Sequence, residues 1–287
     1  MRLGRLFELA IAAGRRADPR RDAVREFADS AILYGKKDRQ VHSVLVGIDI
    51  DVQEILLADR LKASRHIDCV ISHHPSGHAY AGLYRVMDLQ AQLLESAGLD
   101  AASARGFLEE RKAEVERKIL PQNHMRAVDA ARLLDIPFVC MHTPADNLAA
   151  RFVERLLSEQ RPRRVRDVIT VLSGVAEYKQ AAAAGTGPRI VLGASERECG
   201  KVFVEMTGGA EGPKGAYRLL RTSGIGTIIS MHMSEDHLKA ARSAGLNAVI
   251  AGHMSSDTLG MNLLLDEIER GERLDITCCS GFSRTRR

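Results

Sequence analysis

The 287-residue chain is predicted to adopt an α/β fold in two halves, each a mostly parallel sheet flanked by helices. Short Val- and Ile-rich runs alternate with longer stretches at helical spacing, which is the pattern of strands joined by crossover helices. Trp is absent and aromatic residues make up 4% of the chain, so Leu, Ile, Val, Ala and Met must build the core. A basic, Pro-containing stretch at 161–166 divides the chain into an N-terminal α/β half, 1–160, and a C-terminal α/β half, 161–287.

The first half opens with Leu3, Leu6, Phe7 and Ala10 at helical spacing, so residues 1–40 are expected to be helical, with a break at Asp18-Pro19. A β-branched run at 41–50 predicts the first strand. The elements expected after it are a helix at 52–62, a strand at 67–72, a helix at 82–97, a helical stretch at 106–134 interrupted near Pro121, a strand at 137–141 and a helix at 147–157.

The second half repeats the alternation of strands and helices. Its Arg-rich end, residues 284–287, is expected to be a loose tail. The expected elements are strands at 190–192 and 202–206, a helix at 213–221, a strand at 227–231, a helix at 234–244, a strand at 248–251, a helix at 256–270 and a strand near 274–278.

Charge and cysteine content limit the class of protein. The net charge of +4 is too small to indicate nucleic-acid binding, and its excess lies in residues 1–40, where ten Lys/Arg oppose six Asp/Glu. That excess fits a solvated helix surface or an acidic partner. Five cysteines without a C-x-x-C pair favour a reducing compartment, with Cys69 and Cys140 buried as small hydrophobes. No signal peptide and no apolar run of the ~20 residues that a membrane helix needs is found, so a cytoplasmic protein without a membrane partner is expected.

Three motifs follow predicted strands: Ser72-His73-His74-Pro75, His142-Thr143-Pro144-Ala145-Asp146 and Gly252-His253-Met254-Ser255-Ser256-Asp257. In open α/β sheets, ligands bind beyond the carboxyl ends of the strands. The shared placement therefore predicts that the motifs converge on one site, in the cleft between the two halves.

His73 and His74 are neighbours, and neighbours on a regular strand point to opposite faces. Either the strand ends here, because Pro75 bends the chain, or each imidazole serves a different ion of a pair ~3.5–4 Å apart. A lone histidine is more often a satisfied core or surface group, but a His-His-Pro sequence at a strand end indicates metal ligands. His78 is interpreted as a loop residue.

His253 and Asp257 share one side of a first helical turn if the helix starts near Ser255. The competing interpretation of Asp257 is a first-turn acid stabilised by the helix dipole. Asp146 is predicted to be a ligand that His142 orients, and the alternative is a cap of the helix that starts at Asn147.

The predicted metal set is His73, His74, Asp146, His253 and Asp257. Two divalent ions with two carboxylates and neutral imidazoles leave a charge of about +2, which favours water activation and an anionic substrate. Nitrogen and oxygen ligands without thiolate fit Zn, Mn, Fe, Co or Ni better than Cu(I).

Two further segments could contribute chemistry. His232 and Glu235 follow a predicted strand and are the candidate general acid/base residues, although helix capping and a solvated first-turn acid also explain them. The Gly-rich turn Thr207-Gly208-Gly209-Ala210-Glu211-Gly212-Pro213-Lys214-Gly215 fits either a phosphate contact or a tight structural turn. Asp49 is placed near the same cleft, and His124 has no assigned role.

The order of the three motifs, with Leu45-Val46-Gly47-Ile48-Asp49 before the first, resembles the Nif-three-like family, also labelled type 2 GTP cyclohydrolase I. The resemblance covers the chain from about Val41 onward. It implies a two-part α/β fold, a toroidal homo-hexamer, and a dinuclear site at His73, His74, Asp146, His253 and Asp257.

The chain departs from the family pattern in three places. The third motif ends in Asp257 where Glu is common, and Ser76-Gly77-His78 replace bulky apolar residues. The segment near 101–135 and the Gly-rich turn resemble a longer prokaryotic subgroup.

The expected function is that of a metal-dependent hydrolase acting on a nucleotide-like or other anionic small molecule, as the cyclohydrolase label implies. The alternative is a non-catalytic metal-binding scaffold or regulatory interaction protein. An acid/base residue beside the metal set would favour the enzyme, and an exposed apolar patch elsewhere would favour the scaffold.

Overall fold

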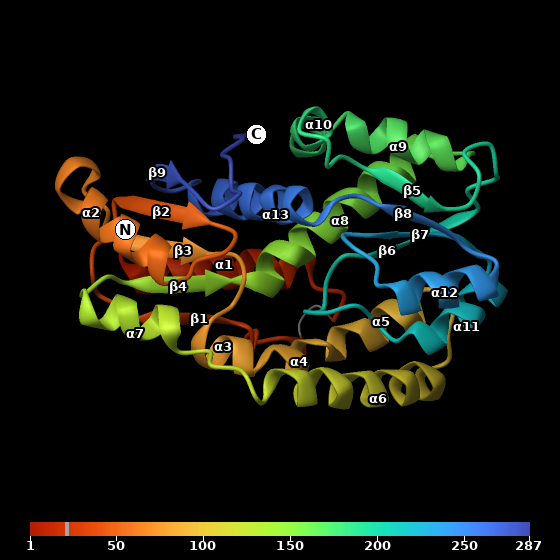
Figure 1. Ribbon diagram of the computed structural model, residues 1–287, viewed down its shortest axis with the longest axis horizontal. Helices are drawn as coiled ribbons and strands as arrows, with labels where there is room; N and C mark the ends of the chain where they lie inside the picture. The colour runs from red at the N-terminus through yellow and green to blue at the C-terminus, as the bar shows by residue number, and fades with distance from the viewer. Residues whose placement is uncertain (21–22) are drawn as a thin grey trace.

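The computed structural model describes residues 1–20 and 23–287. Two sheets lie side by side along the long axis, and the helix α8 (His142–Gln160) runs from the first sheet toward the second (Figure 1). Both sheets are mostly parallel and flanked by helices, so the predicted α/β class is confirmed.

The first sheet has the strand order β1-β4-β3-β2-β9. All neighbours are parallel except β1, which runs antiparallel to β4. The strands are β1 (Ser30–Tyr34), β2 (Ser43–Gly47), β3 (Cys69–Ser72), β4 (Phe138–Met141) and β9 (Asp275–Cys278). The prediction that residues 1–40 are helical is therefore wrong at β1, because a five-residue apolar run carries no periodicity that separates strand from helix.

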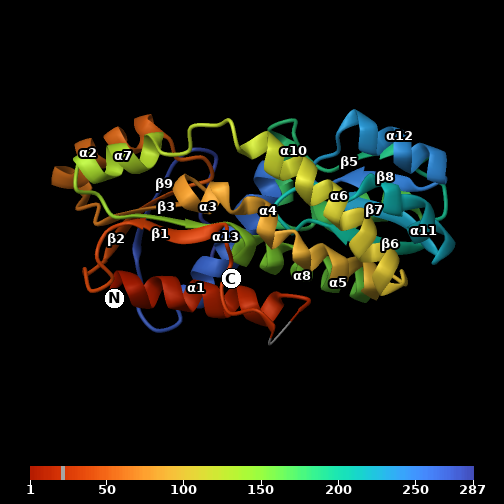
Figure 2. The same ribbon diagram turned by 90° about the horizontal axis from the view of Figure 1, so that it is seen from below.

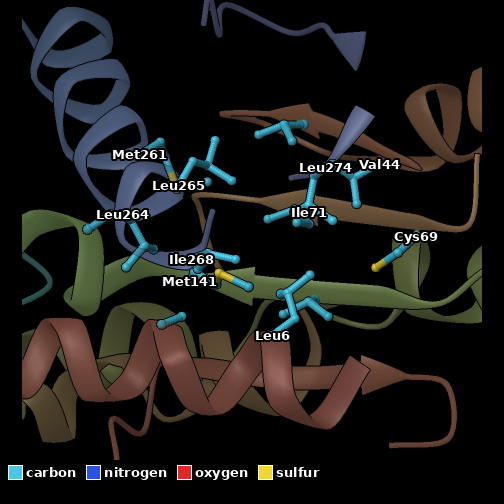
Figure 3. Close-up of a cluster of buried hydrophobic side chains, with 14 of the residues drawn as sticks. Leu6, Val44, Cys69, Ile71, Met141, Met261, Leu264, Leu265, Ile268 and Leu274 are labelled. Atoms are coloured by element: carbon cyan, nitrogen blue, oxygen red, sulfur yellow. The ribbon is translucent and has the colours of Figure 1, made fainter. Parts of the chain in front are cut away.

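Alternating side chains of β2 enter two different cores, as the period of a strand requires. Val44 and Val46 pack with α1 (Leu3–Ala17) and α13 (His253–Ile268), whereas Leu45 packs on the other face with α2 (Val52–Arg65) and α7 (Arg126–Leu133). Figure 2 shows the sheet between α1 on one side and α2 with α7 on the other. In Figure 3, Leu6 of α1, Ile71 of the sheet and Leu264 of α13 meet in the first of these cores.

The second sheet has the order β5-β8-β7-β6, with β5 antiparallel to β8 and the others parallel. Its strands are β5 (Arg189–Leu192), β6 (Lys201–Glu205), β7 (Ile225–Ser230) and β8 (Asn247–Ile250). One face packs on α8, α9 (Val165–Ser173) and α10 (Ala176–Ala183). The other face packs on α5 (Asp88–Ser96), α6 (Ala101–Ile119), α11 (Tyr217–Thr222) and α12 (Glu235–Ala244). The short helices α3 (Gly77–Ala81), α4 (Leu83–Val86) and η2 (Lys214–Ala216) complete the described elements.

The sheets do not follow the predicted division at residue 160. The strand β9, from the end of the chain, pairs with β2 in the first sheet, and Leu274 just before it enters that sheet's core. Conversely, Leu94 and Ala104 of α5 and α6 enter the core of the second sheet. Each half of the chain thus supplies elements that cover apolar surface of the other half's sheet. The local sequence pattern indicates neither of these long-range contacts.

The Arg-rich C-terminus is anchored, contrary to the predicted loose tail. Arg284 pairs with Asp266 at 2.5 Å and with Glu269 at 2.6 Å, and Arg287 pairs with the buried Glu177 at 2.5 Å. Carboxylates that are distant in sequence supply these partners, so composition of the tail alone could not indicate them.

Cysteine burial and helix composition add two smaller observations. Cys69 and Cys140 are buried as expected, and burial raises the pKa of the Cys140 thiol to about 12. Within residues 1–20 and 23–287, no helix combines the length and the apolar character that a membrane span needs.

Candidate metal centre

The first motif directly follows β3. The chain bends at His73 and His74, while their N–H groups still donate to the carbonyl oxygens of Gly47, the last residue of β2, and of Ile48 just after it, both at 3.0 Å. The bend turns both imidazoles toward one cluster, with ring centroids 5.1 Å apart. The structure therefore follows the first of the two predicted routes, in which the strand ends before Pro75.

His73 is buried between two carboxylates. Its Nε2 lies 3.4 Å from Asp146 Oδ1 and 3.5 Å from Asp257 Oδ1. At His74, Nδ1 lies 2.7 Å from Asp49 Oδ1 and Nε2 lies 3.4 Å from Asp257 Oδ2. Asp257 thus faces both members of the histidine pair, and Asp49 holds the far side of His74.

The second motif forms the first turn of α8, which starts at His142 and not at Asn147 as predicted. Pro144 fits this turn because the first N–H groups of a helix have no intrahelical partner. His142 Nδ1 lies 2.8 Å from Asp29 Oδ2, and its Nε2 lies 3.6 Å from Asp146 Oδ2. Since a carboxylate accepts, the Asp29 contact places the proton on Nδ1 and leaves Nε2 free toward the cluster.

The third motif follows β8 and opens α13, which starts at His253 and not near Ser255. Gly252 has a φ of 111°, which favours glycine, and this turn directs the chain from the second sheet back to the first. His253 Nε2 lies 3.5 Å from Asp257 Oδ2 in the predicted i,i+4 arrangement. Burial lowers the pKa of His253, which favours the neutral imidazole that binds metals.

Several of these buried atoms have no hydrogen-bond partner among the described residues. They are both ring nitrogens of His73, Oδ1 of Asp146 and both carboxylate oxygens of Asp257. The contacts of 3.4–3.6 Å between rings and carboxylates are too long for good hydrogen bonds. Because unpaired buried polar atoms cost free energy, this set fits a bound cation that would pair with all of them.

Ligand-capable atoms gather in three overlapping groups, each spanning no more than 4.8 Å. The groups are His73–His74–His142, His74–His253–Asp257 and His73–Asp146–Asp257. All five predicted ligands are therefore brought together, and His142, predicted to act behind Asp146, joins them. These buried His and Asp residues could bind metal ions.

Mutual attraction shifts the pKa values within the cluster. Burial alone would lower the pKa of His73, but Asp257 and Asp146 outweigh it and raise the pKa to about 10. Burial alone would raise the pKa of Asp257, but His73, His74 and His253 hold it well below its usual range. Without a metal ion, a proton on His73 compensates the buried carboxylates.

A cavity of about 60 Å³ adjoins the cluster, with His142, Asp146, His253 and Asp257 in its lining. His232, after β7, also lines it, and its ring lies 4.9 Å from that of His253. Glu235 is exposed in the first turn of α12 and is not in this lining, because the Ser234 cap turns that face of the helix outward.

Glu211, and not Glu235, places its side chain at this cavity beside His232. It lines the cavity, accepts from the Ser234 N–H at 2.6 Å, and lies 3.8 Å from His232 Nδ1. The signal that could have identified it is its position just after β6, beyond the carboxyl end of a parallel strand, as for the other site residues.

The remaining candidates lie outside the cluster. His78 is exposed on α3, so its prediction as a loop residue is wrong. The His124 ring lies 4.9 Å from the Tyr80 ring in a tilted arrangement, beside a neighbouring cavity of about 260 Å³. The Gly-rich turn packs on α5, where Gln90 donates to the carbonyl groups of Gly208 at 3.2 Å and Ala210 at 2.7 Å. A side chain at Gly208 would meet Gln90 at 2.6 Å, so close packing requires glycine there.

Comparisons with known proteins agree with this architecture. No protein-family model and no curated protein matches the chain. Among solved structures, a NIF3 superfamily protein from Sphaerobacter thermophilus is 27% identical with a TM-score of 0.81, over 96% of this chain and 97% of that chain.

More distant structures share the fold. TTHA1606 from Thermus thermophilus is 15% identical with a TM-score of 0.56, and reduced HcgD from Methanocaldococcus jannaschii is 14% identical with a TM-score of 0.55. Each of these two comparisons covers 97% of both chains. The ordered His/Asp motifs and the match to the Sphaerobacter protein along nearly the whole chain support a Nif3-like family assignment.

Proposed function

We propose that this protein is a metal-dependent hydrolase that binds two divalent ions. The observation that carries the proposal is the set of buried, unpartnered atoms of His73, Asp146 and Asp257 at the centre of three overlapping ligand groups. The residues that would hold the ions are His73, His74, His142, Asp146, His253 and Asp257.

Divalent ions in such a site lower the pKa of bound water and polarise a carbonyl or phosphoryl oxygen. The chain's own residues contribute orientation and proton handling. Asp29 and Asp49 fix the rings of His142 and His74 through Nδ1, at 2.8 and 2.7 Å. His232, with Glu211 behind it, lines the cavity beside the ligand set and is placed to exchange a proton with substrate.

The first test is elemental analysis of protein purified without chelator and without added metal. About two transition-metal ions per chain are expected, and the His73→Ala/His253→Ala double variant should lose them while remaining folded. His78→Ala is the matched control because that imidazole is exposed and outside the cluster. Metal absent from the wild type, or retained in the double variant, would refute the ligand assignment.

Hydrolysis is tested next with the metal-loaded protein and a panel of nucleotides and small cyclic amides, assayed beside the double variant. The resemblance to the cyclohydrolase-type proteins motivates the nucleotide-like, anionic part of the panel. Turnover that follows metal content supports the enzyme. Full metal occupancy without turnover of any member supports the non-catalytic scaffold.

One observation favours an additional role in self-association. Leu56 and Leu57 of α2 are 50% and 43% exposed, and Leu133 of the adjacent α7 is 75% exposed. We propose that this apolar face contributes to the homo-hexamer that the resemblance implies. Sedimentation of the wild type and of a Leu56→Ser/Leu133→Ser variant tests it, and a wild-type monomer would contradict it.

A further inference from the structure

The cavity beside the metal cluster is acidic on both walls. Asp146 and Asp257 belong to one wall, and Glu205 and Glu211 belong to the other. No Lys or Arg side chain is found in its lining within the described part of the chain. A site that receives a phosphate or carboxylate group normally offers such a side chain, because its charge and donors match the anion.

The surrounding carboxylates also cancel the charge that two divalent ions would bring. Two divalent ions would bring four positive charges, and the ligands Asp146 and Asp257 would neutralise two of them. The carboxylates of Asp29 and Asp49, which contact the rings of His142 and His74, would neutralise the other two. Glu211 then adds one negative charge at the cavity surface. The chain therefore gives the cavity no electrostatic preference for an anion.

Glu211 is held in place as a hydrogen-bond acceptor. Its Oε1 accepts from the Ser234 N–H at the start of α12, at 2.6 Å, and its Oε2 lies 3.4 Å from His237 Nδ1. The start of α12 and His237 thus fix the orientation of the Glu211 side chain. Its remaining lone pairs are available to a donor in the cavity.

Glu205 lies next to it at the end of β6 and is fixed by two neutral donors. The Tyr217 hydroxyl donates to Oε2 and the Gly212 N–H donates to Oε1, both at 3.0 Å. Burial raises the pKa of Glu205 although both donors act in the opposite direction. Its carboxyl group therefore adds hydrogen-bonding capacity to the cavity wall.

Ser230 supplies an independent indication of a ligand. It ends β7 in register with Glu205 and lines the cavity, and it is 3% exposed. Its hydroxyl has no hydrogen-bond partner among the residues described. A buried hydroxyl without a partner is costly, and a bound ligand that presents an acceptor would satisfy it.

We propose that Glu205, Glu211 and Ser230 form a recognition wall for a neutral substrate group that carries adjacent N–H and C=O functions, as in an amide or a cyclic ureide. Glu211 accepts a hydrogen bond from the substrate N–H, and Ser230 donates one to the substrate carbonyl oxygen. Glu205 offers a further hydrogen-bonding group beside them. This inference rests on the proposed function, because it names the group that is presented to the metal cluster. The cavity is small, about 60 Å³, so it receives the reacting edge of a substrate while the rest of the molecule lies outside it.

The test compares two probes by calorimetric titration, hydantoin as a neutral cyclic ureide and inorganic phosphate as an anion. Both are titrated into metal-free and Zn-loaded protein, with metal content measured for every sample. Hydantoin is expected to bind the Zn-loaded wild type at least tenfold more tightly than phosphate. Ser230→Ala and Glu211→Gln should each weaken hydantoin binding at least fivefold, and Glu211→Gln should strengthen phosphate binding.

Glu235→Gln is the matched control, because it removes the same charge from an exposed position outside the cavity, and it should leave both affinities unchanged. Tighter phosphate than hydantoin binding by the wild type, or hydantoin binding that neither Ser230→Ala nor Glu211→Gln changes, overturns the recognition wall. If the wild type takes up no metal, the proposed hydrolase fails, and the same probe comparison in the metal-free protein still decides this inference.

Discussion

The Nδ1 of His142 lies 2.8 Å from Oδ2 of Asp29, a fully buried carboxylate that also accepts from the Thr143 hydroxyl at 2.6 Å. This contact joins the loop before β1 to the first turn of α8. It sets the tautomer of His142 and directs Nε2 at the metal cluster. Asp49 holds His74 in the same way. Two of the four clustered imidazoles are therefore oriented by a carboxylate that is not itself in the ligand set.

Asp29→Asn should therefore weaken metal binding without removing a ligand. Asparagine of the same shape can offer its amide N–H to Nδ1, which would move the proton to Nε2 and block that nitrogen. The expected loss of metal affinity is about 10- to 100-fold, which is the usual effect of mutating a residue that orients a metal ligand. Competition with a chelating dye measures it.

Asp38→Asn is the control for this substitution, since Asp38 is exposed on the loop after β1. The orienting role of Asp29 would be rejected if the Asp29 and Asp38 variants bound zinc equally well.

The helices α8 and α13 carry four of the ligand residues and approach closely at Gly260. A Cβ added there would lie 2.5 Å from the carbonyl oxygen of Ala145, a backbone atom that cannot move aside. Gly260→Ala should push the two helices apart, with an unfolding free energy lower by about 1–3 kcal/mol and weaker metal binding. Gly271→Ala is the control, because no atom lies within 4 Å of its added Cβ. Chemical denaturation and zinc titration measure both, and equal behaviour of the two variants would exclude the close contact.

The raised pKa of His73, about 10, makes zinc binding pH-dependent. Below pH 10 the metal-free site holds a proton on His73 that zinc must displace, so affinity should rise with pH by up to tenfold per unit between about pH 7 and 9. In the metal-free protein the same proton stabilises the fold, fully below the unfolded pKa of about 6.5 and progressively less as pH rises through 10. Calorimetry in buffers of different ionisation enthalpy should detect about one proton released per His73 site at pH 7.5. Zinc uptake without proton release would contradict the assigned pKa.

The fold class and the convergence of the three motifs could be predicted because they depend on local pattern. His73, Asp146 and Asp257 each follow a strand signal, and the carboxyl ends of parallel strands bring such positions together. The helix starts at His142 and His253 were misplaced by two to five residues, because only the tertiary turn decides where a first helical residue lies.

What could not be predicted depends on contacts between distant segments. Asp29 and Ser230 carry no motif, and their roles follow only from packing against α8 and beside Glu205. The sequence points to Glu235 because it stands near His232, whereas the fold brings Glu211 to His232 from the turn after β6. The pairing of β9 with β2 likewise has no local signature.

The C-terminal anchor gives a final prediction. The Arg284 side chain is 8% exposed and its guanidinium lies between Asp266 and Glu269, which belong to or adjoin α13, the helix that carries His253 and Asp257. Arg284→Ala leaves Asp266 without its cation and leaves Glu269 only the exposed Arg286, and loss of a buried partner typically costs about 3–5 kcal/mol, so the unfolding midpoint should fall clearly. Arg286→Ala is the control, because that side chain is 52% exposed and its contact with Glu269 is 3.3 Å. Denaturation of both variants measures the difference. Equal midpoints would mean that the tail is loose in solution, and a metal content that falls only in Arg284→Ala would show that the tail supports the metal centre through α13.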